Sequence, residues 1–288
     1  MKKYAVIDIG SNSVRLMFVA NGKVLYKRLN TTRLGEGIAA RPRLKAEAIE
    51  RSAVAVEAFY RQAQAEGAES VFAFATAAVR STENGAEFVS RVKELCGLEV
   101  EVVSGETEAE IGVLGAFGNA DGALIDIGGA STELVVRKRG KFVYKKSVDI
   151  GAVRLKDICG GNGEALAAFC ERAVGAFGQV PAPSKVYAVG GTATTIAALV
   201  LGLEEYDSNK ITGARITREG LSALLRRLLS MTVEEIAALP CMPKGRADIV
   251  TGGVIWLDEL MKAFAIPEIF VSDRDNLEGY ALKKGLTV

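Results

Sequence analysis

A nine-residue string that occurs twice in related form constrains the fold of this chain more than any other feature. DIGSNSVRL runs from Asp8 to Leu16, and DIGGASTEL runs from Asp126 to Leu134. Each copy follows a short apolar run, which is typical of a buried strand that ends at a glycine-bearing turn. The repeat predicts one fold that is used twice around a single anionic ligand.

The residue types in the two turns favour phosphate and a metal ion as ligands. Small Gly and Ser residues leave backbone N–H groups and hydroxyls free to approach phosphate oxygens. The carboxylate at each strand end suits a hard divalent cation rather than the phosphate itself. One such turn would be a weak signal, because Gly and Ser also close ordinary hairpins. Two copies in matching strand contexts strengthen the hypothesis.

Composition excludes several classes of mechanism. The 288 residues contain no histidine, which removes Ser-His-Asp triads and imidazole-ligated zinc and leaves acid–base chemistry to carboxylates. The 36 basic and 35 acidic residues give a net charge of +1, which predicts neither a nucleic-acid nor a membrane partner. Four cysteines without a CxxC pair predict reduced thiols. With no signal peptide and no apolar run of roughly 20 residues, we expect a cytoplasmic protein.

The order of predicted strands and helices is the same in both halves, βββαβαβα. We therefore expect an α/β protein with two domains, residues 1–119 and 120–288. In the first half we predict strands at 4–9, 14–20, 23–30, 70–75 and 99–103, with helices at 45–66, at 85–96 and from 106. In the second half we predict strands at 123–127, 132–138, 141–148, 185–189 and 268–272, with helices ending near 178, at 192–201 and at 276–284.

An insertion at about residues 212–264 breaks this symmetry and is predicted to be a satellite helical unit. Thr232 and Glu235 form a capping-box pattern for a short helix. A longer helix is predicted over 244–264, where it would form one wall of a cleft. The basic clusters at 137–139 and 145–146 are interpreted as solvated hairpin edges, with docking of a long phosphate chain as the alternative.

Seven short strings, in order along nearly the whole chain, resemble the exopolyphosphatase and guanosine pentaphosphate phosphohydrolase family, within the actin, sugar-kinase and heat-shock ATPase superfamily. The resemblance implies two actin-like (ribonuclease H-like) domains with the active site in the cleft between them. The strings are DIGSNSVRL (8–16), ATAAVRSTENG (75–85), SGETEAEIGVLGAFG (104–118), DIGGASTEL (126–134), DIGAVRL (149–155), AVGGTATTIAAL (188–199) and GRADIVTGG (245–253).

The resemblance implies metal-assisted hydrolysis of a terminal phosphoanhydride, with Glu108 as the catalytic base. The helical pattern supports this choice, because Glu106 and Glu110 are four residues apart and share a face, whereas Glu108 points to the opposite side. Gly112 and Gly115 continue the stripe of Glu108 and would let another backbone come close. The alternative is a solvent-exposed Glu108 without a catalytic role.

Further site residues follow from the resemblance and from the chemistry of phosphoryl transfer. Magnesium, or another divalent cation, would be held by Asp126 and Glu133, with Asp8 as a further candidate. Gly190, Gly191 and Thr192 are a possible nucleotide-binding segment. The predicted phosphate ligands are Ser11, Asn12, Ser13, Arg15, Arg80, Gly128, Gly129, Ser131 and Thr132, of which the two arginines would be cationic clamps.

The sequence differs from the family pattern in three features. Ala130 stands where the family commonly has a third glycine, and Leu277 replaces an arginine, so a cationic role at that place is lost. The chain also ends at Val288, without the helical C-terminal domains of long family members, and is interpreted as a short two-domain form with a more open cleft.

Polyphosphate is the predicted substrate, and guanosine pentaphosphate is the alternative. A nucleotide-dependent kinase and a non-catalytic polyphosphate or alarmone sensor are the competing functions. A homodimer is possible if an exposed helix at 192–201, rich in Ala, Ile and Leu, forms an interface.

Overall fold

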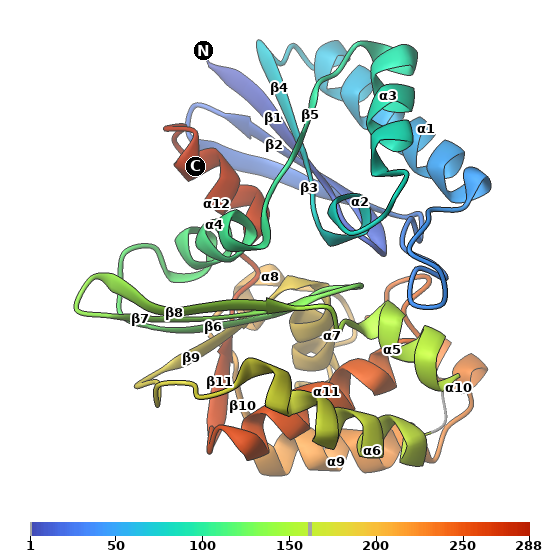
Figure 1. Cartoon of the computed structure of the whole chain (residues 1–288). Helices are drawn as coiled ribbons and strands as arrows, with labels where there is room; N and C mark the ends of the chain where they lie inside the picture. Colours follow the sequence, from blue (N-terminus) through green and yellow to red (C-terminus); the bar gives the residue numbers. More distant parts are fainter. Residues whose placement is uncertain (1, 161–162) are drawn as a thin grey trace.

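The computed structural model describes residues 2–160 and 163–288 and folds them into two α/β lobes, one above the other in Figure 1. The first lobe is built on a five-stranded sheet in the order β3-β2-β1-β4-β5, in which the pairs β1–β4 and β4–β5 are parallel and the pairs β1–β2 and β2–β3 are antiparallel. Its elements are β1 (Lys3–Ile9), β2 (Ser13–Ala20), β3 (Lys23–Thr31), α1 (Ala46–Ala65), β4 (Ser70–Ala75), α2 (Ala77–Arg80), α3 (Gly85–Cys96), β5 (Val100–Val102) and α4 (Gly105–Phe117).

The second lobe repeats this arrangement and adds to it. Its sheet has the order β10-β11-β9-β6-β7-β8, and the part from β11 to β8 has the same order as the first sheet. The added edge strand β10 pairs antiparallel with β11. The elements are β6 (Gly122–Ile127), β7 (Thr132–Lys138), β8 (Lys141–Val148), α5 (Ala152–Cys159), α6 (Gly163–Ala173), a 3-10 helix (Val174–Phe177), β9 (Val186–Val189), α7 (Gly190–Val200), α8 (Ser208–Ile211), β10 (Arg215–Thr217), α9 (Arg218–Leu229), α10 (Val233–Ala237), α11 (Val250–Ala263), β11 (Glu268–Val271) and α12 (Asn276–Lys283).

The two glycine turns have the same backbone geometry. In the first, the N–H of Gly10 donates to the carbonyl of Ser13 over 3.0 Å, and in the second Gly128 donates to Ser131 over the same distance. The flanking strands also pair in the same register, with Asp8 opposite Arg15 and Asp126 opposite Glu133. The repeat in the sequence is therefore a repeat in the structure, with the same strand–turn–strand unit in each lobe.

Helices α4 and α12 connect the lobes by packing on the sheet of the opposite half. Ala109 and Val113 of α4 are buried against the second sheet, whereas Leu277 and Tyr280 of α12 are buried against the first. The two helices cross at glycines, since a side chain on Gly115 would overlap the backbone of Asp275 and one on Gly279 would overlap that of Ile111. The close approach predicted for Gly115 is confirmed, and both helices lie between the sheets in Figure 1.

Three details of the second half differ from the sequence-based expectation. The helix predicted over 244–264 begins only at Val250, because residues 245–249 form turns in which Arg246 donates its N–H to Pro243 and Ile249 to Arg246. Strand β10 was not predicted. Helix α7 is buried in the second lobe rather than exposed, so it does not offer the dimer interface that its apolar composition suggested. The capping box at Thr232 and Glu235 is confirmed.

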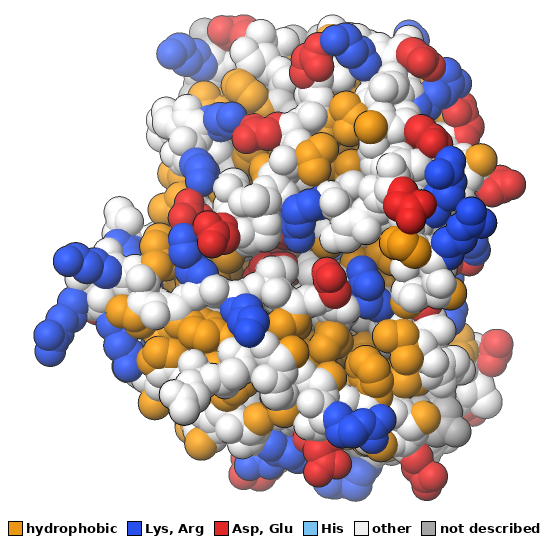
Figure 2. All heavy atoms as spheres, in the orientation of Figure 1, with side chains coloured by type: hydrophobic (Ala, Val, Ile, Leu, Met, Phe, Trp, Pro, Cys, Tyr) orange, Lys and Arg blue, Asp and Glu red, His pale blue; other side chains and the backbone are white. Residues whose placement is uncertain are grey.

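The surface carries both charges in alternation over the face seen in Figure 2, with a basic cluster at the tip of the β7–β8 hairpin. This hairpin tip contains Arg137, Lys138 and Arg139, as the sequence predicted. No helix among residues 2–160 and 163–288 is long and apolar enough to cross a membrane.

Candidate active site

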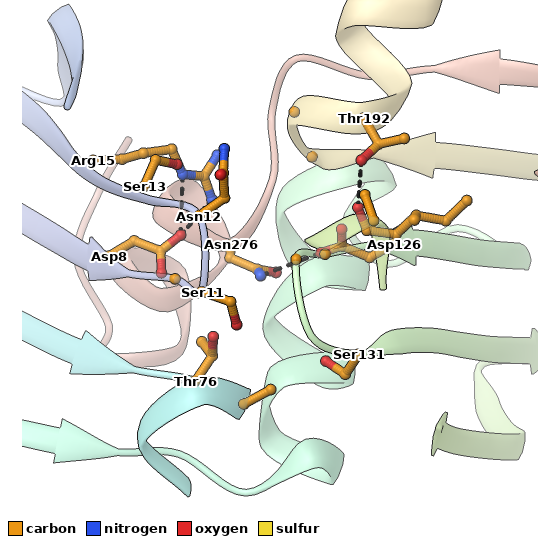
Figure 3. A pocket seen from close by; sticks show the side chains of 18 of the residues that line it. Asp8, Ser11, Asn12, Ser13, Arg15, Thr76, Asp126, Ser131, Thr192 and Asn276 are labelled. Atoms are coloured by element: carbon orange, nitrogen blue, oxygen red, sulfur yellow. Dashed lines mark hydrogen bonds and ion pairs between the residues drawn. The ribbon is translucent and has the colours of Figure 1, made fainter. Parts of the chain in front are cut away.

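The two glycine turns face one another across a small pocket between the lobes, with a volume of about 70 Å³ (Figure 3). Ser11 of the first turn and Gly129 of the second are in contact, since a Cβ atom added to Gly129 would lie 2.8 Å from the Cβ of Ser11. Thr76 and Ser131 lie towards one end of the pocket in Figure 3, and Arg15 and Thr192 lie towards the other. The pocket therefore has two distinct ends.

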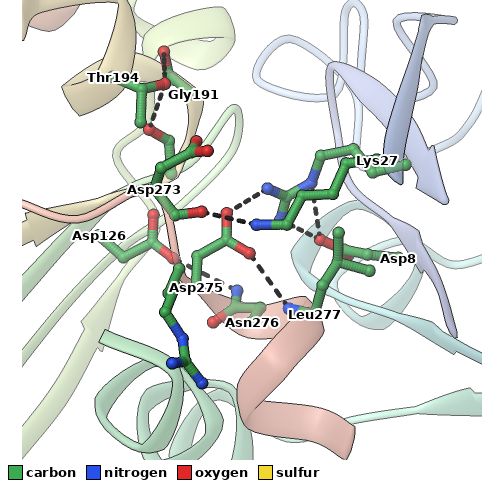
Figure 4. Close-up of polar contacts among 12 residues, drawn as sticks. Asp8, Lys27, Asp126, Gly191, Thr194, Asp273, Asp275, Asn276 and Leu277 are labelled. Carbon is green, nitrogen blue, oxygen red and sulfur yellow. Dashed lines mark hydrogen bonds and ion pairs between the residues drawn. The ribbon is translucent and has the colours of Figure 1, made fainter. Parts of the chain in front are cut away.

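Arg15 is held in the first turn by two carboxylates from opposite parts of the chain. It pairs with Asp8, opposite it in the β1–β2 ladder, and with Asp275 at the start of α12. Figure 4 labels the two carboxylates, and Figure 3 labels Arg15. Burial raises the pKa of Asp8, and the attraction of Arg15 only partly offsets this effect. Burial also raises the pKa of Asp275, but the attraction of Arg15 and Lys27 is larger in sum, so the pKa of this carboxyl is lowered. Asp275 therefore remains ionised and orients Arg15.

The second turn carries acidic groups at the equivalent positions. Asp126 receives a hydrogen bond of 3.3 Å from the side-chain amide of Asn276, and Glu133 receives one of 2.6 Å from Ser147. Burial, together with the charges of Asp275 and Glu108, raises the pKa of Asp126 well above its usual range. Burial and the charges of Glu108 and Asp126 do the same for Glu133.

Glu108 lies between the two turns on α4 and is 6% exposed, so the alternative of a solvent-exposed glutamate is wrong. Arg80 Nη1 donates to its Oε2 over 2.9 Å and to the carbonyl of Val103 over the same distance. Burial raises the pKa of Glu108, and Arg80 partly offsets this shift. On another face of α4, Glu110 pairs with Lys145 and Lys283 at the surface. The helical-face argument therefore separated the buried from the surface carboxylate correctly.

The carboxylates of this site are suited to a divalent cation that keeps part of its water shell. Asp8 Oδ1 and Asn276 Oδ1 are buried without a hydrogen-bond partner among the described residues. Their free lone pairs, and the mutual repulsion of Asp126 and Glu133, fit a bound cation. In the described part of the chain no three His, Cys, Asp or Glu side chains converge closely enough to hold a metal by themselves. Few protein ligands and several waters are typical of magnesium sites.

Most of the predicted phosphate ligands come together in the pocket, but three site residues do not line it. Arg80 lies behind Glu108, and Glu133 is buried behind the second turn. The hydroxyl of Thr132 is used inside the lobe, where it donates to the Ile150 carbonyl and accepts from Trp256. The predicted residues that line the pocket are Asp8, Ser11, Asn12, Ser13, Arg15, Glu108, Asp126, Gly128, Gly129, Ser131, Gly190, Gly191 and Thr192.

Arg246 is a pocket residue that the sequence did not single out. Its side chain lies against Gly191, where any larger residue would overlap the guanidinium, and only 8% of the residue is exposed. Burial and the nearby charge of Arg15 lower its pKa to about 10. No carboxylate in the described part of the chain forms an ion pair with it, so a buried cation faces the pocket without a partner. Arg246 belongs to the string GRADIVTGG, which resembles the family, but no pattern within that string indicated that the arginine lines the pocket.

Asn12, Thr76 and Asn276 complete the polar lining. Both side-chain polar atoms of Asn12 are buried without a partner among the described residues, which leaves them free for a ligand. Thr76 donates to Glu108 and Asn276 to Asp126, and neither was predicted. They come from the end of β4 and the start of α12, which the local sequence does not connect with the turns.

The two departures from the family pattern fill apolar positions. The side chain of Ala130 is 1% exposed and packs into the core of the first lobe, although it belongs to the second turn. Leu277 is fully buried under the first sheet. Asp275 and Lys27 lie nearby, so the place of the missing arginine is next to an existing cation.

A second pocket, of about 210 Å³, opens from the Arg15 end of the first. The two share Arg15, Gly190, Gly191 and Arg246. Most of the exposed lining of the second pocket is apolar, with Leu29 and Pro243 among its residues, and Lys27 and Arg28 also line it. Tyr206 and Asp273 lie at its edge and are hydrogen-bonded to each other.

Two repeated α/β units that present glycine turns, buried carboxylates and two arginines to one pocket define a two-lobed protein of the actin-like fold that handles phosphorylated ligands. Residues 16–287 match the sequence profile of the Ppx/GppA phosphatase family. The chain belongs to this family.

The chain is also similar to individual family members over its full length. It is 32% identical to exopolyphosphatase 2 of Mycobacterium tuberculosis, over 98% of each chain. It is 27% identical to a guanosine-5'-triphosphate,3'-diphosphate pyrophosphatase of Aeromonas salmonicida, over 98% of this chain and 58% of that protein. The crystal structure of the Aquifex aeolicus family member superposes with a TM-score of 0.80 at 28% identity, over 99% of this chain and 97% of that one.

Proposed function

We propose that this protein is an exopolyphosphatase, which releases terminal orthophosphate from inorganic polyphosphate with Glu108 as the base. The observation that carries the proposal is the position of Glu108, a buried carboxylate between two phosphate turns with a raised pKa. A carboxylate whose pKa is raised is a stronger base and is suited to activating water. The exopolyphosphatase of M. tuberculosis, similar over nearly the whole chain, supports the substrate class.

The geometry supports an in-line displacement on the terminal phosphorus. Glu108 orients a water molecule and takes its proton while the water oxygen bonds to phosphorus and the bond to the bridging oxygen breaks. The electron pair leaves with the shortened chain, whose new terminal phosphate is an oxyanion. Backbone N–H groups and hydroxyls of the two turns donate to the equatorial oxygens. Because attack and departure are on opposite sides of phosphorus, the chain extends away from Glu108, towards Arg15 and Arg246.

Magnesium is the proposed cofactor, and Asp126, Glu133 and Asp8 are the residues that would hold it, directly or through water. Bound there, the cation would neutralise charge on the transferred phosphoryl group. The unpartnered oxygen of Asp8 and the raised pKa values of Asp126 and Glu133 support this choice. The protein's own part is to hold these carboxylates, together with Arg15 and Arg246, in fixed positions around the pocket.

Guanosine pentaphosphate is the second candidate substrate, and the pocket of about 210 Å³ favours it. Its apolar lining and Tyr206 offer a surface for a base, and the Asp273 carboxylate could accept hydrogen bonds from guanine. Arg15 and Arg246 lie between this pocket and the phosphate turns. The similar pyrophosphatase of A. salmonicida supports the same alternative.

The free thiols of all four cysteines support a cytoplasmic location.

A substrate panel with a base variant tests the proposal. We expect magnesium-dependent phosphate release from polyphosphate, and expect Glu108→Gln to reduce kcat by about 10²–10⁴-fold. The matched control is Glu110→Gln on the same helix, which removes only surface ion pairs and should keep the wild-type rate. Faster turnover of guanosine pentaphosphate would favour the second substrate. Binding without turnover would favour a sensor, and ATP consumption that depends on an added acceptor would favour a kinase.

A further inference from the structure

A separate surface groove lies directly behind Glu108. It has a volume of about 510 Å³ and is lined by Arg80, Ser104, Lys145, Lys146 and Asp149, among others. None of its lining residues lines the catalytic pocket. One side-chain contact joins the two linings, the ion pair at 2.9 Å between Arg80 of the groove and Glu108 of the pocket. At this point the partition is an arginine–glutamate pair.

The stereochemistry of the reaction places the product next to this partition, and this step rests on the proposed function. The attacking water lies on the side of Glu108, and the remaining chain extends towards Arg15 and Arg246. Glu108 bonds to Thr76, which lies at the opposite end of the pocket from Arg15 in Figure 3. The freed orthophosphate is thus left between the chain on one side and the Arg80–Glu108 pair on the other.

We propose that the groove lined by Arg80, Lys145 and Lys146 is an exit site for orthophosphate. With the shortened chain still bound, the mouth at Arg15 is occupied, and the product lies on the far side of the chain from that mouth. Leaving on the Glu108 side allows the chain to stay bound and advance by one phosphate. The groove assigns a second anion site to the protein, for inorganic phosphate rather than for the polymer.

The charges of the groove suit a transient rather than a tight phosphate site. Lys146 is exposed and forms no ion pair with any described residue, whereas Lys145 pairs with Glu110 at 2.9 Å. Ser104 and the first residues of α4 add hydroxyl and backbone donors. Two carboxylates, Glu106 and Asp149, also line the groove and limit its affinity for an anion. A weak net attraction draws the product out without retaining it.

Arg80 is suited to act as the gate between the two spaces. It lines the groove while it bonds to Glu108 and to the Val103 carbonyl. When Glu108 accepts the proton of the attacking water, its negative charge is lost and its hold on Arg80 weakens. Arg80 can then pair with the newly formed phosphate instead. The chemical step itself thereby loosens the partition at the moment when the product has to pass.

Lys146→Glu tests the exit site, because this exposed residue lies in the groove and outside the catalytic pocket. Lys141→Glu is the control, with the same change of charge on the same strand at the hairpin end. We measure bond cleavage by rapid quench and free phosphate with a fluorescent phosphate sensor. Lys146→Glu should keep the cleavage rate within twofold of wild type and slow phosphate release at least fivefold, and Lys141→Glu should change neither.

Equal release rates in the two variants would overturn the proposal. So would a Lys146→Glu variant whose KM for polyphosphate rises while release follows cleavage without delay, since the groove would then hold the chain. If the wild-type protein cleaves no substrate, the proposed function fails, and calorimetric titration with inorganic phosphate decides the groove by itself. Phosphate binding that is weaker in Lys146→Glu but unchanged in Lys141→Glu supports the site. Identical phosphate binding in the wild type and both variants rejects it.

Discussion

The two glycine turns have the same backbone but opposite charge at the same position. Arg15 lies opposite Asp8 in the first turn, and Glu133 lies opposite Asp126 in the second. In the first turn Arg15 pairs with Asp8, whereas in the second turn burial and the charges of neighbouring carboxylates raise the pKa of both Asp126 and Glu133. One repeated scaffold thus carries a cation–carboxylate pair in one lobe and two carboxylates in the other, as we propose for a turn that positions phosphate and a turn that holds magnesium.

The first turn should lose more stability than the second when its charged residue is neutralised. Arg15→Gln leaves Asp8 and Asp275 buried without their cation, and we expect a loss of about 3–5 kcal/mol in the free energy of unfolding. Urea unfolding followed by circular dichroism measures this loss. A decrease below about 1 kcal/mol would show that the two turns do not differ in this way.

The contact between the turns can be tested with two neighbouring glycines. A Cβ on Gly129 would lie 2.8 Å from Ser11 of the other turn, so Gly129→Ala should cost about 1–3 kcal/mol or push the lobes apart. Gly128→Ala is the control, because its Cβ would meet only the carbonyl of Ser131 in its own turn, at 3.2 Å. Thermal unfolding compares the two, and equal losses would mean that the turns do not touch in solution.

In the second turn, neutralising the acidic residue should have the opposite sign. Glu133→Gln removes one member of a repelling set while Ser147 can still donate to the side-chain oxygen. Without magnesium we expect a gain of about 1 kcal/mol in the free energy of unfolding at neutral pH. The same variant should need more magnesium for half-maximal activity. A loss of stability as large as that of Arg15→Gln would remove the contrast between the turns.

The smallest expected effect is the pH dependence of stabilisation by magnesium. Folding raises the pKa values of Asp126 and Glu133, so these groups favour the folded state at low pH, and this contribution is lost as the pH rises through their folded pKa values. A cation that binds the ionised carboxyls should therefore raise Tm by a few degrees at pH 8 and hardly at pH 5. Differential scanning fluorimetry at both pH values checks this, and an equal shift at both would contradict it.

Local patterns predicted the framework of the fold with good accuracy. The predicted bounds of β7 and β8 agree with the structure, and the two turns close with the same hydrogen bond. Alternating and continuous apolar runs report burial directly, which explains this success. The missed elements, such as β10 with its three residues, are too short to show a period. The prediction of a helix over 244–264 was wrong at its start, because residues 245–249 form turns and the helix begins at Val250.

The site divides in the same way between local and distant signals. The pocket residues that belong to the two turns could be predicted, because each turn is one short stretch of sequence. They include Ser11, Ser13, Gly128 and Ser131. Arg246 and Asn276 lie far from the turns in sequence, and their place in the pocket depends on how the second lobe and α12 pack. Thr132 was assigned to the phosphate although its hydroxyl bonds to Ile150 and Trp256, a contact that spans 124 residues for the tryptophan.

By itself, the sequence determined that two acidic glycine turns end two equivalent strands and that no imidazole is present for acid–base chemistry, because strand period, turn residues and the absence of histidine are local or compositional properties. The tertiary structure decided which charges neutralise one another. Asp275 reaches Arg15 because the α4–α12 crossing brings the end of the chain back to the first turn, and Arg246 forms no ion pair with any acid among the described residues. Pairing depends on distance and burial in space, which spacing along the chain does not contain.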